Sequence, residues 1–172
     1  MESDSGNKLG VVPGDTLTVE DCLYGLLLVS ANQAANALAE HVAGSIPAFV
    51  DMMNDKLAEL GCTESHFDNP SGLNGDTQYV TAYDMALIAQ AAYQNETLLE
   101  ISSVKNHKLA PTINYPGGLT VNQEHRLLKE GDDFYYSPAK AGKTGYLQAA
   151  GNTLVTYAEK DGRRLVSVVL KG

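Results

Sequence analysis

Lys143-Thr144-Gly145 is the triplet whose residue types and spacing first suggest chemistry. An ammonium group next to a hydroxyl could hold a carboxylate, and a glycine lets a ligand approach the backbone closely. The following residues, 152–159 and 163–170, are rich in Val, Leu, Thr and Tyr, and Asp161-Gly162 lies between them. Asp-Gly between two such runs is typical of a two-residue hairpin turn. The triplet is therefore predicted to lead into an antiparallel sheet, where it could face an open cleft.

A second candidate lies at the end of a strongly apolar run. Residues 19–29 are apolar on nearly every helical face, which is typical of a helix buried on all sides. Thr18, with Asp21 three residues later, is predicted to cap this helix. Ser30-Ala31-Asn32 then places two small polar residues where a buried helix would continue with Leu or Ala. We interpret Ser30 and Asn32 as candidate functional side chains.

The other elements that must position these residues are helices followed by a sheet. Ser45 and Thr81 are N-cap candidates, and Gly44 and Gly61 are stop signals. The predicted helices cover residues 19–29, 33–42, 47–60, 82–93 and 96–101, with a loop at 66–79 and short extended segments at 105–109 and 119–121. We therefore predict one α+β domain, with a helical region at about 18–102 and a sheet region at about 103–172.

Composition and charge exclude several classes of function. The net charge of −9 argues against nucleic acid or an anionic membrane surface as the main partner. Cys22 and Cys62 are too few and too far apart for a disulfide framework or a cysteine metal site. The four histidines also lack the spacing of metal ligands. We expect no metal ion and no cofactor.

Ser-x-Asn and Lys-Thr-Gly are two of the three motifs in the active sites of penicillin-binding proteins and serine β-lactamases. Residues 17–44 (LTVEDCLYGLLLVSANQAANALAEHVAG) resemble the second-motif helix of the low-molecular-mass D-alanyl-D-alanine carboxypeptidases, peptidase family S11. Residues 67–87 are similar to the loop and helix that follow it, and residues 140–170 resemble the third motif and the last strands. The resemblance runs from about Leu9 to the end of the chain. It implies a β-lactamase/transpeptidase-like fold, a helical cluster plus an antiparallel sheet.

The resemblance also implies a serine acyl-transfer mechanism. A nucleophilic serine attacks the carbonyl between two D-alanines, the terminal D-alanine leaves, and water cleaves the acyl-enzyme. In this mechanism Ser30 would relay a proton toward the leaving amine. Asn32 would bind the substrate's amide and orient the catalytic lysine.

The same resemblance assigns substrate-binding roles to the third motif. Lys143 and Thr144 would bind the terminal carboxylate, and Gly145 would let the substrate approach the strand. The backbone N–H of Tyr146 would supply half of the oxyanion hole. Many relatives have His at this position, so the resemblance gives no role to the tyrosine side chain. The implied partners are a peptidoglycan stem peptide ending in D-Ala-D-Ala and β-lactam antibiotics, and the implied location is the outer face of the cytoplasmic membrane.

The family's first motif, Ser-x-x-Lys, is not found in a suitable setting. Its chemistry needs Ser and Lys one helical turn apart at the start of a buried apolar helix. The letter matches at Ser5, Ser102 and Ser137 lie in a Gly/Pro-rich lead-in, at the end of a helix, and directly before the Lys-Thr-Gly strand. We therefore expect a fragment, truncated at both ends and inactive alone, from an active enzyme. Residues 163–170 would then form an open sheet edge, which predicts pairing with another copy of the chain.

Two other functions stay open from the sequence. A serine β-lactamase shares the fold and motifs, but class A enzymes need a loop glutamate that activates the deacylating water. The loop here reads Asn69-Pro70-Ser71-Gly72-Leu73 and contains no Glu-x-x-Leu-Asn. A non-catalytic peptidoglycan-binding or regulatory module could also keep this scaffold without a nucleophile. A Ser-x-x-Lys ahead of an apolar helix in the upstream reading frame would distinguish a cut enzyme from such a module.

Overall fold

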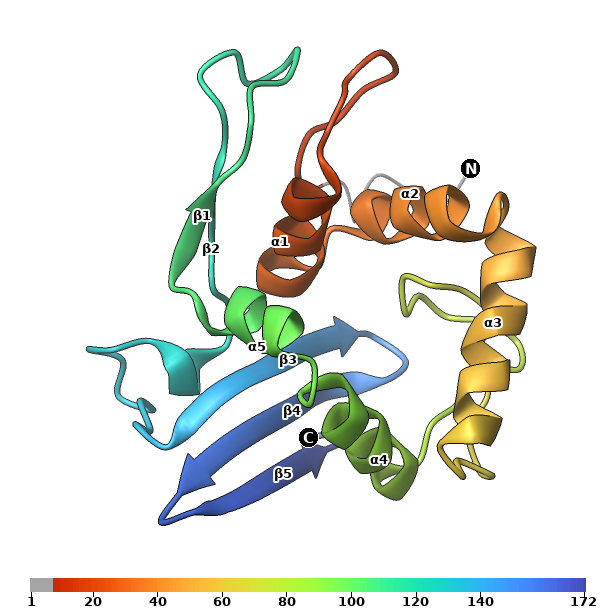
Figure 1. The fold of residues 1–172 in the computed structure, drawn as a ribbon, viewed down its shortest axis with the longest axis vertical. Coiled ribbons are helices and arrows are strands. Elements are labelled where there is room, and N and C mark those ends of the chain that lie inside the picture. The colour runs from red at the N-terminus through yellow and green to blue at the C-terminus, as the bar shows by residue number, and fades with distance from the viewer. Residues whose placement is uncertain (1–7) are drawn as a thin grey trace.

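The computed structural model describes residues 8–172 as an α+β fold, as predicted (Figure 1). The helices are α1 (Val19–Val29), α2 (Asn32–Ala43), α3 (Ile46–Glu59), α4 (Ala82–Ala92) and α5 (Glu96–Ser103), with a short 3-10 helix η2 (Arg126–Leu128). Each α-helix begins and ends within two residues of its predicted bounds. In the described part of the chain, no helix combines the length and apolar character that crossing a bilayer requires.

Side-chain caps determine where four of the helices begin. In each case the cap oxygen accepts a hydrogen bond from the backbone N–H three residues later, at 3.0–3.3 Å. The capping residues are Thr18, Ser45, Thr81 and Asn95. The first three caps confirm the predictions made from sequence. Helix α2 begins differently, because its N-cap Ala31 has no side chain that could accept such a bond.

The described strands form two separate antiparallel sheets. The first pairs β1 (Asn106–Lys108) with β2 (Thr120–Asn122), and the second has the order β3-β4-β5. Its strands are β3 (Ala139–Leu147), β4 (Gly151–Lys160) and β5 (Arg163–Val169). The Lys143-Thr144-Gly145 triplet thus lies in the middle of β3, an edge strand of this sheet.

The turn between β4 and β5 confirms the Asp-Gly prediction. Lys160 pairs with Arg163, so Asp161 and Gly162 are the two central residues of the hairpin. Both have positive φ, 52° and 72°, as a type I′ turn requires. This turn sets the register of β5 on β4, with Val168 opposite Val155.

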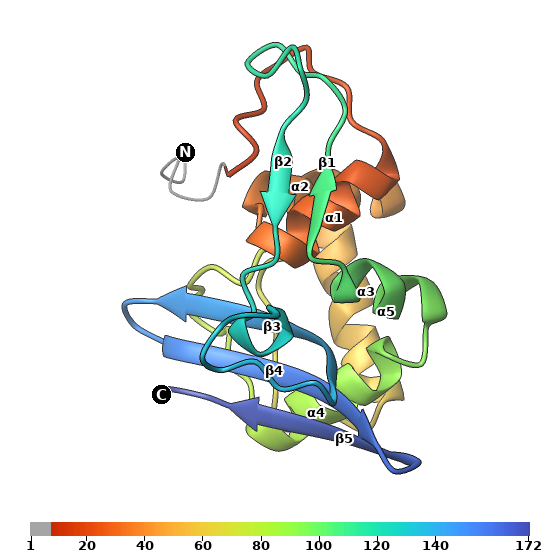
Figure 2. The ribbon, with the colours of Figure 1, turned by 90° about the vertical axis from the view of Figure 1, so that its left-hand side faces the viewer.

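Two apolar clusters hold these elements together. The larger cluster joins α1 and the start of α2 to α5 and to the β1–β2 hairpin, and its most buried members include Leu28, Ala31 and Val121. The smaller cluster joins α4 to β3 and β4 through Tyr93 and Tyr157, whose rings lie 5.3 Å apart. Figure 2 shows the hairpin standing against α1, away from the three-stranded sheet. The end of α1 and the middle of β3 meet between the two clusters.

Candidate active site

Ser30 adopts an unusual backbone conformation between α1 and α2. It lies in the left-handed region, with φ 56° and ψ 47°, which costs a residue with a Cβ roughly 1–2 kcal/mol. Its N–H donates to Leu26 and the N–H of Ala31 donates to Gly25, so α1 is closed off before α2 begins. The fully buried Ala31 anchors this break in the larger apolar cluster. The break directs the Ser30 side chain out of the helix axis, and strain of this kind occurs preferentially at functional sites.

Lys143 connects the two predicted motifs across 113 residues of sequence. Its Nζ donates a hydrogen bond to Ser30 Oγ and a second, at 2.7 Å, to the backbone carbonyl of Thr144. The lysine lies on β3 opposite Val155 of β4. The sheet and the helix break therefore bring an ammonium group and a hydroxyl group into direct contact.

Burial changes the protonation of Lys143. Loss of solvent lowers its pKa from 10.5 to about 8, and Glu124 and Lys8 act in opposite directions on this value. Glu124 favours the ammonium form, and Lys8, which forms an ion pair with Glu124 at 2.8 Å, disfavours it. Lys143 is thus a partly desolvated cation. Such a cation gains from the arrival of a carboxylate more than an exposed lysine does.

Of the other predicted site residues, only Thr144 bonds to this contact, through the backbone carbonyl that accepts from Lys143. Asn32 is the first residue of α2 and is half-buried, and its side chain has no hydrogen bond within residues 8–172. Thr144 and Gly145 follow Lys143 on β3 and are half-buried. Tyr146 is the most exposed, at 69%. Its side chain is largely exposed to solvent, and it is the last of the predicted site residues along β3.

An open groove along β2 reaches Val29, the residue that precedes Ser30. It has a volume of about 370 Å³, and it is lined by Lys8, Val29, Lys129 and the residues 119–124. Val29 directly precedes Ser30, and Glu124 and Lys8 influence Lys143 electrostatically. The sequence predicts an extended segment at 119–121, which β2 confirms, but no motif identifies Lys8, Glu124 or their neighbours as part of a site.

Within the described residues, none of the Ser-x-x-Lys matches has the geometry of a nucleophilic serine with a lysine base. Ser5 lies outside them. Ser102 is 1% exposed in the last turn of α5, and its partner Lys105 forms an ion pair with Glu130 instead. Ser137 precedes β3, and Lys140 donates only to the backbone carbonyl of Ser137. No group of three side chains in residues 8–172 could hold a metal ion either.

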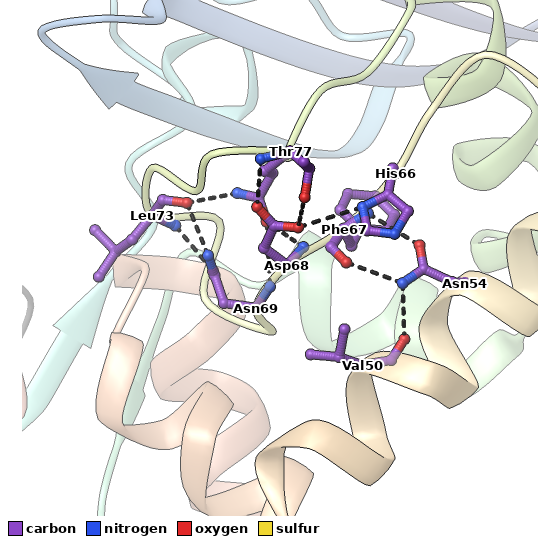
Figure 3. Close-up of polar contacts among 9 residues, drawn as sticks. Val50, Asn54, His66, Phe67, Asp68, Asn69, Leu73 and Thr77 are labelled. Atoms are coloured by element: carbon purple, nitrogen blue, oxygen red, sulfur yellow. Dashed lines mark hydrogen bonds and ion pairs between the residues drawn. The ribbon is translucent and has the colours of Figure 1, made fainter.

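The loop at 66–79 is held by side-chain hydrogen bonds rather than by regular structure (Figure 3). Asn54 of α3 bonds both backbone groups of Phe67, at 2.9 and 3.0 Å, and also the carbonyl of Val50. Asp68 accepts hydrogen bonds from the side chain and backbone N–H of Thr77. In Figures 1 and 2 the loop runs past the end of β3. It therefore forms a fixed border of the site.

Replacing Asn54 by alanine should loosen this border. The change leaves the N–H and C=O of Phe67 without their partner, which costs roughly 1–3 kcal/mol. Amide hydrogen exchange across residues 66–79 should accelerate, whereas β3 and β4 should keep their protection. Asp55→Ala, at an exposed position of the same helix, is the matched control. Unchanged exchange in Asn54→Ala would contradict this role.

Acid should loosen the same loop through Asp68. The hydrogen bond from the Thr77 hydroxyl lowers the pKa of Asp68 below its ordinary value, with smaller contributions from the Thr77 N–H and from His66. A carboxylate with a depressed folded-state pKa stabilises the fold fully above its unfolded pKa, and this stabilisation is lost as the pH falls through the folded value. The protection of residues 66–79, measured relative to the intrinsic exchange rate at each pH, should therefore fall below about pH 4. In Asp68→Asn this acid dependence should disappear.

Comparison with known proteins supports the family resemblance. The sequence matches the D-alanyl-D-alanine carboxypeptidase family, peptidase S11, over residues 2–172. The chain belongs to this family. Its sequence is 40% identical to that of the D-alanyl-D-alanine carboxypeptidase DacB2 of Mycobacterium tuberculosis. This similarity covers 96% of the present chain and 55% of the relative. The chain is 35% identical to DacA of Escherichia coli, over 93% of its own length and 37% of that protein's.

Solved S11-like structures have the same fold. A crystal structure of a D-alanyl-D-alanine carboxypeptidase from M. tuberculosis superimposes with a TM-score of 0.85 at 39% identity, over 96% of this chain and 60% of that one. A mutant of the Streptomyces K15 DD-transpeptidase superimposes with a TM-score of 0.86 at 28% identity, over 98% of this chain and 66% of that one. The chain spans about half the length of the carboxypeptidases it matches. These structures confirm the predicted transpeptidase-like fold.

Proposed function

We propose that this chain forms the substrate-recognising part of a serine-type D-alanyl-D-alanine carboxypeptidase. The reaction removes the terminal D-alanine from a peptidoglycan pentapeptide through an acyl-enzyme. The observation that carries the proposal is the hydrogen bond between Lys143 and Ser30, which joins two motifs of an S11 chain. Membership in the family supports the carboxypeptidase reaction. The position of Lys143 supports a ligand that carries a carboxylate.

Lys143 and Thr144 hold the terminal carboxylate of the substrate in this proposal. A pKa of about 8 leaves Lys143 mostly protonated at neutral pH, and a carboxylate in the same partly desolvated site favours the ammonium form further. The stem peptide lies along the free edge of β3, because an edge strand offers unpaired backbone groups to an extended peptide. Gly145 leaves space on that strand, and the N–H of Tyr146 faces the developing oxyanion.

Ser30 and Asn32 act on the reacting part of the substrate. The Ser30 hydroxyl accepts from the Lys143 ammonium, so its own proton is free to point toward a leaving amine. It passes that proton to the amine and regains one from Lys143, which makes Ser30 a relay. Asn32 stands two residues away at the start of α2 and binds the substrate's amide.

A nucleophile from a Ser-x-x-Lys segment completes the site, and the serines in residues 8–172 do not supply it. Incubation of this 172-residue chain with benzylpenicillin should therefore give no covalent adduct in intact-mass spectrometry. A full-length S11 carboxypeptidase is the positive control and should gain one penicilloyl group. A stoichiometric adduct on this chain would contradict the proposal, and peptide mapping would identify the reactive serine.

The 66–79 loop supports a carboxypeptidase over a class A β-lactamase. The loop contains no glutamate that could activate a deacylating water. Asn69 is occupied structurally, because its Oδ1 accepts from the N–H groups of Gly72 and Leu73 and its Nδ2 donates to the Leu73 carbonyl. β-Lactam antibiotics are then slow substrates that mimic D-Ala-D-Ala. In this proposal the enzyme acts in the cell envelope, outside the cytoplasmic membrane, and has a role in maintaining the wall and cell shape.

We also propose that the chain alone pairs with a second copy through the edge of β5. This strand has no neighbour on its outer side in the described sheet, and Leu165 and Val169 on it are 64% and 47% exposed. Light scattering should show a dimer whose population rises with concentration. Leu165→Lys should shift it toward monomer. A strict monomer at high concentration would contradict the pairing.

A further inference from the structure

His125 is a buried titratable side chain that packs against the Lys-Thr-Gly strand and that the proposed reaction does not use. It lies between β2 and η2, and its side chain is fully buried. Its backbone N–H donates to Gln123 Oε1 at 3.1 Å, and Gln123 Nε2 donates to the carbonyl of Ser102 in α5 at 2.9 Å. Gln123 is itself 3% exposed. Gln123 thus connects the backbone of His125 to helix α5 and fixes its position.

The imidazole reaches the middle of the three-stranded sheet. Its Nε2 lies 2.9 Å from Thr156 Oγ1 and 3.3 Å from the backbone carbonyl of Val155. A carbonyl oxygen only accepts, so the neutral tautomer with hydrogen on Nε2 satisfies this contact. Thr156 and Val155 are the register partners of Gly142 and Lys143 on β3. The imidazole therefore binds β4 at the two residues that pair with Lys143 and its neighbour.

Gly142 lets the imidazole approach the strand itself. A Cβ at this position would lie 2.5 Å from both Cδ2 and Nε2 of His125 and 2.4 Å from the Val155 carbonyl oxygen. The imidazole thus packs against the backbone of β3 at the residue that directly precedes Lys143. Side chains alternate between the faces of a strand, so His125 supports the strand from the face opposite to Lys143.

We propose that His125 is a positioning residue for Lys143: its neutral imidazole holds the Gly142–Thr156 rung of the sheet and so fixes the Lys143 ammonium beside Ser30. Support of this kind has a functional effect because a displacement of about 1 Å is enough to weaken a hydrogen-bonded ligand site considerably. The importance of Lys143 in this inference rests on the proposed function. The support of its strand by His125 does not.

Substitutions can separate the hydrogen bonds that His125 makes to β4 from its packing against Gly142. His125→Leu keeps much of the volume and removes the hydrogen bonds, whereas His125→Gln can place an N–H close to the position of Nε2. Leu57→Ala, in the buried face of α3, is the matched control for a general loss of core stability. Thr156→Val removes only the hydroxyl partner and serves as the milder variant.

The test is an NMR titration of the Lys143 side chain, labelled at Cε, in each variant of this chain. The wild type should titrate near the pKa of about 8. His125→Leu should raise this pKa by about one unit or more toward the value of an exposed lysine, because the ammonium group gains solvent. Thr156→Val should shift it in the same direction by less, and His125→Gln and Leu57→Ala should keep the wild-type value.

A merely structural role predicts a different pattern. His125→Leu and Leu57→Ala would then lower the unfolding midpoint alike and leave the Lys143 titration unchanged, which would overturn the inference. Addition of N-acetyl-D-Ala-D-Ala tests the proposed function separately. If the peptide does not bind but His125→Leu still shifts the lysine, only the proposed function fails.

Discussion

Replacing Lys143 by methionine should stabilise the fold and at the same time weaken its affinity for a D-alanyl-D-alanine peptide. A folded-state pKa of about 8, against 10.5 in the unfolded chain, means that folding disfavours the ammonium form. This shift corresponds to roughly 3 kcal/mol at neutral pH. Methionine keeps the apolar length of the side chain without the charge. The hydrogen bonds to Ser30 and to the Thr144 carbonyl are both lost, and at about 1 kcal/mol each they offset part of the gain.

The pH dependence of stability identifies the cause of this gain. Between the folded pKa of about 8 and the unfolded value of 10.5, the unfolded chain holds the Lys143 proton more tightly than the folded chain does. Stability therefore rises with pH across this window for the wild type, and the penalty is complete below it. In Lys143→Met this contribution should be absent. Urea unfolding at pH 7 and pH 10 measures it, with Lys140→Met at an exposed position of the same strand as control.

The affinity should change in the opposite direction. A charge-assisted hydrogen bond to a carboxylate contributes about 1.5–3 kcal/mol, so Lys143→Met should weaken binding of N-acetyl-D-Ala-D-Ala by about 10–100-fold in calorimetry. Wild-type binding should also weaken as the pH rises through about 8, where Lys143 loses its charge. If Lys143→Met is more stable and still binds N-acetyl-D-Ala-D-Ala with wild-type affinity, Lys143 does not take part in recognition.

Gly142→Ala is expected to be among the most damaging single substitutions in the sheet. The new Cβ would meet the Val155 backbone and His125 at 2.4–2.5 Å, and neither is the flexible end of a long side chain. The strand must move, at a cost of about 3 kcal/mol or more. Because Lys143 is the next residue, its hydrogen bond to Ser30 should be lost as well.

Gly145→Ala is the matched control on the same strand. Its Cβ would meet only the Thr153 hydroxyl, at 2.4 Å, and this side chain can rotate away. The cost should stay below about 1 kcal/mol, since alanine also restricts the unfolded chain. Thermal unfolding of the two variants measures the difference. Equal midpoints would show that β3 and β4 adapt to a side chain at 142, against the close packing described above.

Local signals in the sequence were sufficient for the elements that carry the site. Ser30 interrupts an apolar run, and the structure ends α1 at that point with a left-handed residue. Asp161-Gly162 has the φ angles that a two-residue hairpin needs, and this turn determines the register of β4 and β5. These features depend on the backbone preferences of a few neighbouring residues, so they can be predicted from the local sequence.

Long-range features could not be obtained in this way. The contact between Ser30 and Lys143 joins residues 113 positions apart, and only the family resemblance placed them in one site. The extended segments near 105–109 and 119–121 form a hairpin that packs on α1, apart from the main sheet, because their apolar residues are covered by the larger cluster. The role of His125 could not be predicted, because its contact with Gly142 arises from tertiary packing and no sequence pattern indicates it.

An NMR comparison of two peptides tests most directly whether Lys143, beside Ser30, recognises a terminal carboxylate. N-acetyl-D-Ala-D-Ala and its C-terminal amide differ only in the carboxylate. We expect the acid to shift the Lys143 side-chain signal saturably and to raise the pKa of Lys143 above about 8, and the amide to do neither. An equal response to both peptides, or an acid that binds without affecting Lys143, would contradict this recognition.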